Sequence, residues 1–333
     1  MDYLLEIDDL HTYFKTKKGT VKAVNGVSYR VEAGKTLGIV GESGSGKSVS
    51  AMSILKLLDG NGYIDSGEIK FKGRNLVECS QNDMYQIRGN EISVIFQEPM
   101  TSLNPVYTIE KQLNEVYLTH QKISKEEASK KSLEMLNAVK IPNAKSIMKQ
   151  YPHQLSGGMR QRVMIAMALA CEPSLLIADE PTTALDVTIQ AQVLDLIRQL
   201  RDQLGTSMLL ITHDLGVVAQ NCEYVAIMYA GEIIEYGKIH DVFKNSLHPY
   251  TVGLFESIPK LNEEVDRLHP IDGLMPDPAN LPKGCKFHPR CRYAEAICRE
   301  EEPEMVEIEE GHTVCCHRYT GKCGLAEGDK ANG

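Results

Sequence analysis

The sequence predicts an α/β fold in which a largely parallel sheet carries helices. Short apolar runs that end at glycine or at a carboxylate alternate with amphipathic helical patterns, and this alternation is typical of such a sheet. A change of composition near residue 260 indicates a small additional unit at the C-terminal end. The 333 residues leave room for two units, since domains hold roughly 100–200 residues.

The first hundred residues are predicted to be mostly strands. Partial alternation and compact apolar runs predict strands at 4–7, 27–31, 36–40, 68–71 and 92–96. One helical pattern interrupts them, starting after Gly46 and continuing through Leu58.

Helical patterns dominate from about residue 108 to residue 171. Ser124 to Glu127 has the sequence of a capping box, which predicts a helix that runs to about Val139 before Pro142. We interpret the block of residues from about 98 to 171 as an inserted helical lobe.

The next segment returns to alternating strands and helices. Buried strands are expected at 175–178 and 208–211, with an amphipathic helix between them at 187–204. Segments 225–229 and 232–236 flank Ala230-Gly231, which predicts a hairpin.

Beyond Pro259 we expect no further strands, because proline, cysteine and glutamate become frequent. Residues 299–311 alone hold seven acids in thirteen positions. The predicted domains are therefore 1–260 and 261–333.

Charge and apolar patterning exclude several classes of protein. Lys and Arg total 36 and Asp and Glu total 45, so the net charge is −9. This balance argues against a protein held on nucleic acid mainly by phosphate contacts.

The N-terminus is acidic and unlike a signal peptide. The longest apolar stretch, 163–171, is far shorter than the roughly 20 residues that span a bilayer. We expect a cytosolic chain unless a partner carries it to a membrane.

The segment Gly41-Glu42-Ser43-Gly44-Ser45-Gly46-Lys47-Ser48 fits the phosphate-loop pattern GxxxxGK[ST], between a predicted strand and a predicted helix. Glycines let backbone N–H groups converge on an anion, and the helix N-terminus adds partial positive charge. Lys47 would reach the β and γ phosphates, and Ser48 Oγ would coordinate Mg²⁺. The expected nucleotide-binding residues here are Gly41, Ser43, Gly44, Ser45, Gly46, Lys47, Ser48 and Val49.

Asp179 and Glu180 follow the apolar run 175–178. A carboxylate delivered at the end of a buried strand suits the Mg²⁺ site of a phosphate-loop sheet, and Asp179 fits that role. Glu180 would then polarise the attacking water as general base. The alternative is that the two acids begin a solvated turn before Pro181.

Ser156-Gly157-Gly158 precedes a strongly helical run and forms a second candidate anion cradle. One nucleotide rarely needs two cradles from one chain, so we expect this one to serve a nucleotide on another copy; a plain helix N-cap is the alternative. Gln97 and His213 follow predicted strands. Gln97 is a candidate sensor of Mg²⁺ or of the attacking water.

The set and order of these segments resemble the nucleotide-binding subunit of ATP-binding-cassette (ABC) transporters over roughly residues 4–260. The resemblance implies a P-loop NTPase of ABC type, with a RecA-like core, an antiparallel β subdomain and an inserted helical subdomain. It also implies ATP and Mg²⁺ as ligands, and head-to-tail dimers that close over two MgATP.

The same resemblance implies a role for each matching residue. Glu180 would be the catalytic glutamate and His213 the switch histidine, while Gln97 would serve the nucleotide and Mg²⁺. Ser156, Gly157 and Gly158 would contact the partner's γ-phosphate, and Ala184-Leu185-Asp186 match the D-loop. Phe14 fits best the aromatic that stacks on adenine, and Tyr13 is a close second.

Three phrases narrow the resemblance, namely Gln97 to Pro105, ADEPTTALDVTIQAQ from Ala178, and His248 to Thr251. They look like the ATP-binding subunit of bacterial dipeptide and oligopeptide importers; nickel importers of the same branch share them. The resemblance implies two membrane permease subunits, a second ATP-binding subunit, identical or paralogous, and indirectly an extracellular solute-binding protein. The chain would lie peripherally on the cytoplasmic face of the membrane.

A soluble ABC ATPase acting on DNA or ribosomes is the alternative from a different class. Neither a long heptad run nor a second phosphate loop occurs in the sequence, and the charge is −9. We therefore expect no nucleic-acid partner.

Six of the nine cysteines lie in the last 49 residues. In a reducing cytosol, clustered cysteines are more often metal ligands or redox groups than structural disulfides. Cys285, Cys291, Cys298 and Cys316 match neither zinc-ribbon nor short ferredoxin spacing, yet four thiolates this close in sequence can enclose one metal centre. Soft sulfur ligands suit Fe–S or Zn.

The phrase GCKFHPRCRYAEAIC…HTVCCH resembles the C-terminal motif of the same importer subfamily, where it implies a [4Fe–4S] cluster. Alignment of that motif selects Cys316 over Cys315 as the fourth ligand. Two alternatives stay open: Zn²⁺, for which His288, His312 and His317 would compete, and free cysteines in a flexible tail.

Overall fold

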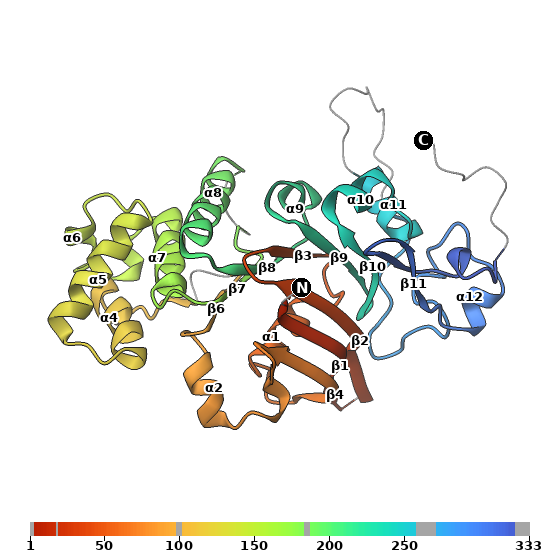
Figure 1. Ribbon diagram of the computed structural model, residues 1–333, viewed down its shortest axis with the longest axis horizontal. Coiled ribbons are helices and arrows are strands. Elements are labelled where there is room, and N and C mark those ends of the chain that lie inside the picture. The colour runs from red at the N-terminus through yellow and green to blue at the C-terminus, as the bar shows by residue number, and fades with distance from the viewer. Residues whose placement is uncertain (1–2, 18, 98–101, 183–186, 258–270, 324–333) are drawn as a thin grey trace. The chain divides into compact units, whose positions relative to one another are not determined.

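The computed structural model describes residues 3–17, 19–97, 102–182, 187–257 and 271–323 (Figure 1). The chain forms two compact units, each built from separate stretches of sequence. The first unit contains residues 1–5, 31–36 and 71–211, and the second contains residues 6–30, 37–70 and 212–333. The predicted boundary near residue 260 lies outside the described residues.

The first unit combines a parallel sheet with a group of helices that lies between two of its strands in sequence (Figure 1). Its elements are, in chain order, β5 (Arg74–Asn75), η1 (Leu76–Glu78), α2 (Gln81–Ile87), β6 (Ile92–Ile95), α4 (Ile109–His120), α5 (Lys125–Ala138), α6 (Ala144–Ile147), η2 (Pro152–Gln154), α7 (Gly157–Leu169), β7 (Leu175–Asp179), α8 (Val187–Leu204) and most of β8 (Ser207–Thr212).

The sheet of the first unit has β7 paired in parallel with β6 on one side and β8 on the other. Every residue of β7 and β8 is buried, as expected for parallel strands that are covered on both faces. The carboxyl ends of these strands meet at one edge, because Ile95 pairs with Ala178 and Asp179 pairs with Ile211.

The predicted helical lobe consists of α4, α5, α6 and α7. Ser124 caps α5 by accepting a hydrogen bond from the Glu127 N–H, and the helix ends at Ala138, so the predicted start and end are both confirmed. Tyr117, Ala128 and Ala170 form a buried cluster that joins the helices.

The second unit holds two sheets and six helices within the residues that the structure describes. Its elements are most of β1 (Tyr3–Thr16) and β2 (Gly19–Glu32), β3 (Thr36–Val40), α1 (Lys47–Ile54), β4 (Gly62–Phe71), α9 (Leu215–Asn221), β9 (Tyr224–Tyr229), β10 (Glu232–Lys238), α10 (Ile239–Lys244), α11 (Pro249–Glu256), α12 (Ile297–Glu300), β11 (Met305–Glu309), β12 (His312–Cys315) and η3 (His317–Tyr319).

One sheet of this unit contains β2, β1 and β4, and the other contains β11, β12, β10, β9 and β3 in that order. The hairpin predicted at Ala230-Gly231 is confirmed. Both residues have positive φ (47° and 86°), as a type I′ turn requires, and Tyr229 pairs with Glu232 across it.

Two expectations about elements were wrong. The helix after Gly46 ends at Ile54 and not at Leu58. Lys56 adopts a left-handed φ of 50°, and the Leu57 N–H bonds to Met52 O, which closes the helix as a Schellman motif.

The second wrong expectation was that strands stop after Pro259. β11 and β12 form an antiparallel hairpin in which β12 pairs with β10, so the C-terminal segment extends the sheet of the second unit. β11 lies at the sheet edge and most of its residues are exposed. Its glutamates therefore leave no apolar strand pattern in the sequence. Charged edge strands of this kind are common.

A buried carboxylate fixes β12 to the rest of the second unit. Glu235 of β10 is fully buried and accepts hydrogen bonds from the backbone N–H groups of Leu247 and His248 and from His312 Nε2, all at 2.9 Å. One side chain thus joins β10, β12 and the start of α11.

We expect Glu235→Ala to lower the free energy of unfolding by about 3 kcal/mol, because it leaves buried donors unsatisfied. Urea unfolding followed by circular dichroism measures the change. Glu309→Ala on the exposed edge strand is the control. Equal midpoints for the two variants would show that the Glu235 contacts add no stability.

No helix within the described ranges has the length and apolarity needed to cross a bilayer.

Candidate functional site

The phosphate loop predicted at Gly41–Ser48 lies in the second unit, between β3 and α1. Gly44 and Gly46 have φ of 82° and 103°, a region that favours glycine. A Cβ at Gly41 or Gly46 would collide with the backbone carbonyls of Met228 and Ala23, respectively. The glycines are therefore needed for this loop to pass so close to its neighbours. Gly46 is also the N-cap of α1 and makes no side-chain cap, which suits an anion at this helix end.

Lys47 is held over the loop. Its side chain is buried, and Nζ donates to Gly41 O at 2.8 Å and to Glu42 O at 2.9 Å. Ser48 follows in the first turn of α1, and Val49 comes next. Ser45 is buried with no hydrogen-bond partner for Oγ, while Ser43 and Gly44 are exposed. The loop thus combines one buried ammonium group with backbone at a helix N-terminus, which is chemistry suited to phosphate.

Tyr250 is a loop contact that the sequence reasoning missed. Its hydroxyl accepts a hydrogen bond of 2.9 Å from the Glu42 N–H. The segment His248 to Thr251 indicated only the family. Nothing in the local sequence indicates that α11 contacts residue 42.

Glu180 lies in the first unit, immediately after β7. It has a left-handed φ of 43°, and its N–H donates to Ile211 O at 2.9 Å. Gln97, which follows β6, donates from Nε2 to Glu180 Oε2 at 2.9 Å. The structure therefore brings together two predicted site residues that are 83 positions apart. Asp179, the last residue of β7, is 7 % exposed.

Ser156 caps α7, accepting a hydrogen bond of 3.3 Å from the Met159 N–H. Ser156 and Gly157 are exposed, and a Cβ added at Gly157 would meet no atom within 4 Å. The same helix contacts the segment after Glu180, because the buried Gln161 donates from Nε2 to Pro181 O at 2.5 Å.

His213 lies in an exposed turn between β8 and α9, in the second unit. The predicted D-loop residues Ala184, Leu185 and Asp186 lie outside the described residues.

The two aromatic candidates for adenine lie on opposite faces of β1. The Tyr13 hydroxyl donates to Asn25 Oδ1 at 3.1 Å. Thr12, on the other face, shares a hydrogen bond of 2.9 Å with Ser53 of α1. Phe14 shares the Thr12 face because side chains alternate along a strand, and its ring packs beside Gly62. Phe14 is therefore on the side of β1 that meets the phosphate-loop helix.

The cysteine cluster also lies in the second unit. Cys285, Cys291, Cys298 and Cys316 line one small cavity of about 10 Å³, roughly the room that one water molecule needs. Burial, with the other three cysteines nearby, raises the pKa of Cys285 to about 12. Burial likewise raises the pKa of Cys316 to about 11. The four cysteine side chains therefore lie close together around one cavity.

Cys315 does not line this cavity. Its thiol donates to Pro303 O at 3.1 Å, on the opposite face of the strand end from Cys316. Cys323 is buried and interacts with Cys298.

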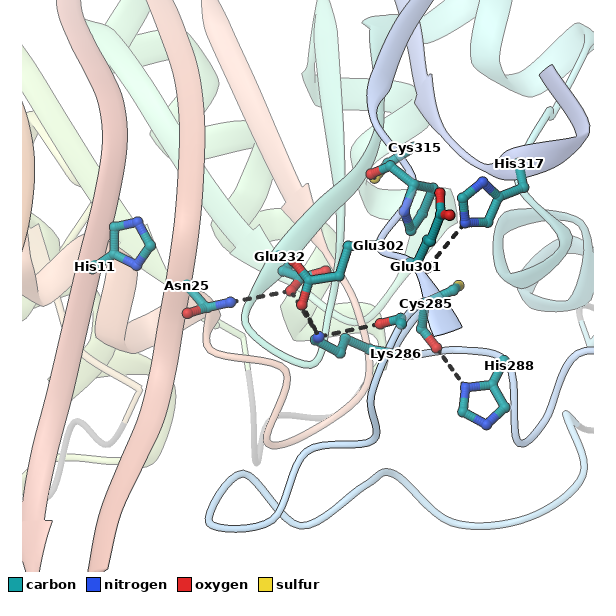
Figure 2. A network of polar contacts seen from close by, with 12 residues as sticks. His11, Asn25, Glu232, Cys285, Lys286, His288, Glu301, Glu302, Cys315 and His317 are labelled. Carbon is teal, nitrogen blue, oxygen red and sulfur yellow. Dashed lines mark hydrogen bonds and ion pairs between the residues drawn. The ribbon is translucent and has the colours of Figure 1, made fainter. Parts of the chain in front are cut away.

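Of the three candidate histidines, two line the cavity and the third does not. His288 and His317 line the cavity, and so does His248. His312 is committed to Glu235 and lies away from the cysteines, so the expectation that it competes as a ligand was wrong. His288 Nδ1 donates to Cys285 O at 2.9 Å, and His317 Nε2 donates to Glu301 O at 3.0 Å (Figure 2).

Lys286 follows Cys285 in the chain but serves a separate polar network (Figure 2). Its Nζ donates to Glu302 Oε1 at 2.5 Å and to Gly284 O at 3.1 Å, and lies 3.9 Å from Glu232 Oε1. Burial raises the pKa of Glu232 to about 7, although Lys286 opposes the shift. Among the described residues, no group of three or more His, Cys, Asp or Glu side chains has the geometry of a formed metal site.

The phosphate loop, with its glycines between a strand and a helix, defines a P-loop nucleotide-binding protein. Residues 24–183 match the family model described as "ABC transporter", and residues 234–298 match "Oligopeptide/dipeptide transporter, C-terminal region". The chain is 51% identical over 320 residues to the oligopeptide transport ATP-binding protein AppD of Bacillus subtilis (strain 168), covering 96% of this chain and 98% of that protein. It is 52% identical to the dipeptide transport ATP-binding protein DppD of Lactococcus lactis, covering 93% and 89%.

Among solved structures, the chain resembles the "Dimeric structure of a post-hydrolysis state of the ATP-binding cassette MJ0796 bound to ADP and Pi". The TM-score is 0.63 with 27% identity, covering 71% of this chain and 98% of that one. The chain belongs to the ABC transporter ATP-binding proteins, in the branch of the oligopeptide and dipeptide transport ATP-binding proteins. It has the ABC nucleotide-binding fold, binds ATP and is an ATPase.

Proposed function

We propose that this chain is the ATP-hydrolysing subunit of a membrane importer for dipeptides or oligopeptides. The names of its relatives support peptides as the solute over nickel, and they do not support a role on DNA or ribosomes. The hydrogen bond of 2.9 Å between Gln97 and Glu180 carries the hydrolytic part of the proposal, because it joins the carboxylate proposed to activate water to the side chain proposed to sense the nucleotide.

In this proposal the predicted site residues have distinct roles. In the loop Gly41–Ser48, Lys47 exchanges its carbonyl partners for the β and γ phosphates. Glu180 accepts a proton from the attacking water, and Gln97 orients the carboxylate that does so. His213 serves as the switch histidine by its position after β8.

Mg²⁺, when bound, neutralises charge on the phosphates, and Ser48, Asp179 and Gln97 have the hydroxyl, carboxylate and amide oxygens that would hold it. Asp179 is preorganised for such a role because it is buried at the end of a parallel strand.

Ser156, Gly157 and Gly158 are proposed to contact the γ-phosphate of a nucleotide on a second ATP-binding subunit. The exposure of Ser156 and Gly157 at the start of α7 supports this, since a partner can reach them. The dimeric state of the related cassette of known structure also supports it. Closure over ATP and opening after hydrolysis would then bias a two-state element of the importer.

The importer would also need two membrane permease subunits and, indirectly, an extracellular solute-binding protein. The chain would then lie on the cytoplasmic face of the membrane, held there by the permeases. The limits 1–260 for the ATPase domain and 261–333 for the extension are part of the same proposal.

We also propose that Cys285, Cys291, Cys298 and Cys316 hold a metal centre, either a [4Fe–4S] cluster or Zn²⁺. Four thiols around one cavity suit soft metals. Metals bind thiolates, so uptake of the metal would release protons from the cysteine thiols. The role of such a centre would be structural or regulatory.

Phe14 is proposed to stack on adenine. We expect Phe14→Ala to weaken ATP binding by about 5- to 150-fold, the equivalent of 1–3 kcal/mol for one stacked base. Titration with a fluorescent ATP analogue measures the affinity. Tyr13→Ala is the comparison and should lose less, because Tyr13 faces Asn25. A larger loss for Tyr13→Ala would transfer the role to Tyr13.

The function is tested by purifying the tagged chain from membranes of its host. We expect permease subunits to co-purify, and ATP hydrolysis by the reconstituted complex to rise when peptide-loaded binding protein is added. Co-purification with ribosomes or DNA instead, or stimulation by nickel and not by peptides, would contradict the proposal.

A further inference from the structure

Arg290 connects the segment 285–298, which carries Cys285, Cys291 and Cys298 and is called the cysteine-bearing segment below, to the phosphate loop. It lies next to Cys291 in sequence, yet its guanidinium forms a bidentate ion pair with Glu42, the second residue of the loop. Nη1 is 2.6 Å from Oε2 and Nη2 is 3.1 Å from Oε1. The Arg290 side chain is 4% exposed and that of Glu42 is 32% exposed. Bidentate pairs that are largely shielded from water are the stronger kind of ion pair.

Further contacts fix the orientation of the guanidinium. Arg290 Nε donates to Asp272 O at 2.8 Å, and Nη2 donates to Ile271 O at 3.2 Å. The guanidinium carbon lies 5.8 Å from the centre of the Tyr229 ring, which itself packs on Tyr250 at 4.7 Å. Arg290 is therefore held in place before any nucleotide arrives.

Glu42 joins this arginine to the machinery of the loop. Its carbonyl accepts from Lys47 Nζ, its N–H donates to the Tyr250 hydroxyl, and its carboxylate binds Arg290. Without Arg290, Glu42 would present an uncompensated negative charge on a loop that must accept phosphates. The Glu42 carboxylate and a phosphate bound by the same loop would repel each other strongly, because water is partly excluded there.

We propose that Arg290 is a positioning residue for the phosphate loop, through which the cysteine-bearing segment sets the affinity of the chain for MgATP. This inference rests on the proposed role of Gly41–Ser48 in binding phosphate. Coupling is reciprocal, so bound nucleotide must in turn stabilise the segment that carries Arg290.

The chain offers a matched control. Arg292 flanks Cys291 on its other side, but pairs with Glu256 at 3.1 Å, and both side chains are about half exposed (58% and 45%). Arg292→Met removes the same charge at the same distance in sequence from Cys291, without touching the loop.

The test compares steady-state ATP hydrolysis by the full chain carrying Arg290→Met or Arg292→Met. We expect Arg290→Met to raise KM for MgATP on the order of 10-fold, in the range of typical coupling energies, with kcat changed less than twofold. Arg292→Met should leave both constants unchanged. Equal KM values for the two variants would overturn the inference.

A second variant separates charge from loss of fold. Glu42→Gln combined with Arg290→Met removes the unpaired carboxylate, so it should recover most of the lost affinity. Should Arg290→Met fail to fold, Arg290→Lys, which keeps the charge but not the bidentate geometry, should give a smaller rise in KM. No rescue by Glu42→Gln, or a wild-type KM for Arg290→Lys, would overturn the inference.

Hydrogen exchange provides the reciprocal readout. A non-hydrolysable ATP analogue should slow exchange of amides 285–298 in the wild type and in Arg292→Met, but not in Arg290→Met. Equal protection in all three would overturn the coupling. If the wild type binds no ATP analogue at all, the proposed function fails, which is distinct from failure of the inference alone.

Discussion

Glu180→Gln is expected to reduce ATP hydrolysis by about 10²–10⁴-fold, the usual contribution of a general base, while ATP binding survives. An amide has the shape of the carboxylate but cannot take a proton from water. Gln97 Nε2 can still donate to the amide oxygen at position 180, so the local geometry should persist. Phosphate release under saturating ATP measures the loss, and equilibrium binding of labelled ATP measures what remains.

The same variant should accumulate as an ATP-bound dimer, since closure no longer ends in hydrolysis. Size-exclusion chromatography with and without ATP detects this. Glu172→Gln is the matched control, because Glu172 precedes the same strand β7 and has a similar left-handed φ of 51°. Turnover retained by Glu180→Gln would remove Glu180 from the role of base.

The proposed metal centre predicts that Cys316→Ser abolishes metal binding by the chain, whereas Cys315→Ser leaves it at the wild-type level. Cys316 lines the cavity with the other three cysteines, and Cys315 points to Pro303 O instead. A hydroxyl is a poor substitute for a thiolate toward soft metals. Iron, zinc and acid-labile sulfide assays on anaerobically purified protein measure the content.

These assays also identify the centre. Four iron atoms and four sulfides per chain indicate a [4Fe–4S] cluster, and zinc without sulfide indicates a zinc site. Metal-free wild-type protein, or metal lost from Cys315→Ser but kept in Cys316→Ser, would refute the proposed ligand set.

Local sequence predicted most of the parallel strands and the helix between β7 and β8. The apolar runs at 175–178 and 208–211 are buried on both faces, and burial of that kind leaves a clear pattern. β11 escaped prediction for the opposite reason. It is an exposed edge strand rich in glutamate, stabilised by pairing with β12 and not by its own apolar pattern.

In the candidate site, too, features with a local sequence pattern were predictable, and contacts between residues far apart in the chain were not. The position of the phosphate loop between β3 and α1, and that of Asp179 and Glu180 at the end of β7, were predictable because apolar runs precede both in the sequence. The Arg290–Glu42 pair was not, since it joins residues 248 positions apart and neither residue has an unusual local context. The choice between Phe14 and Tyr13 likewise required the hydrogen bonds of Thr12 and Tyr13, which show the face each occupies.

We expect ATP hydrolysis by this chain to drive peptide import. The most direct test measures uptake of a labelled oligopeptide into right-side-out membrane vesicles. ATP is supplied inside the vesicles and binding protein outside. Vesicles with the wild-type chain should accumulate peptide only with ATP, and vesicles with Glu180→Gln should not accumulate it. Equal uptake by both vesicle preparations, or none with the wild type under conditions where it hydrolyses ATP, would contradict the account.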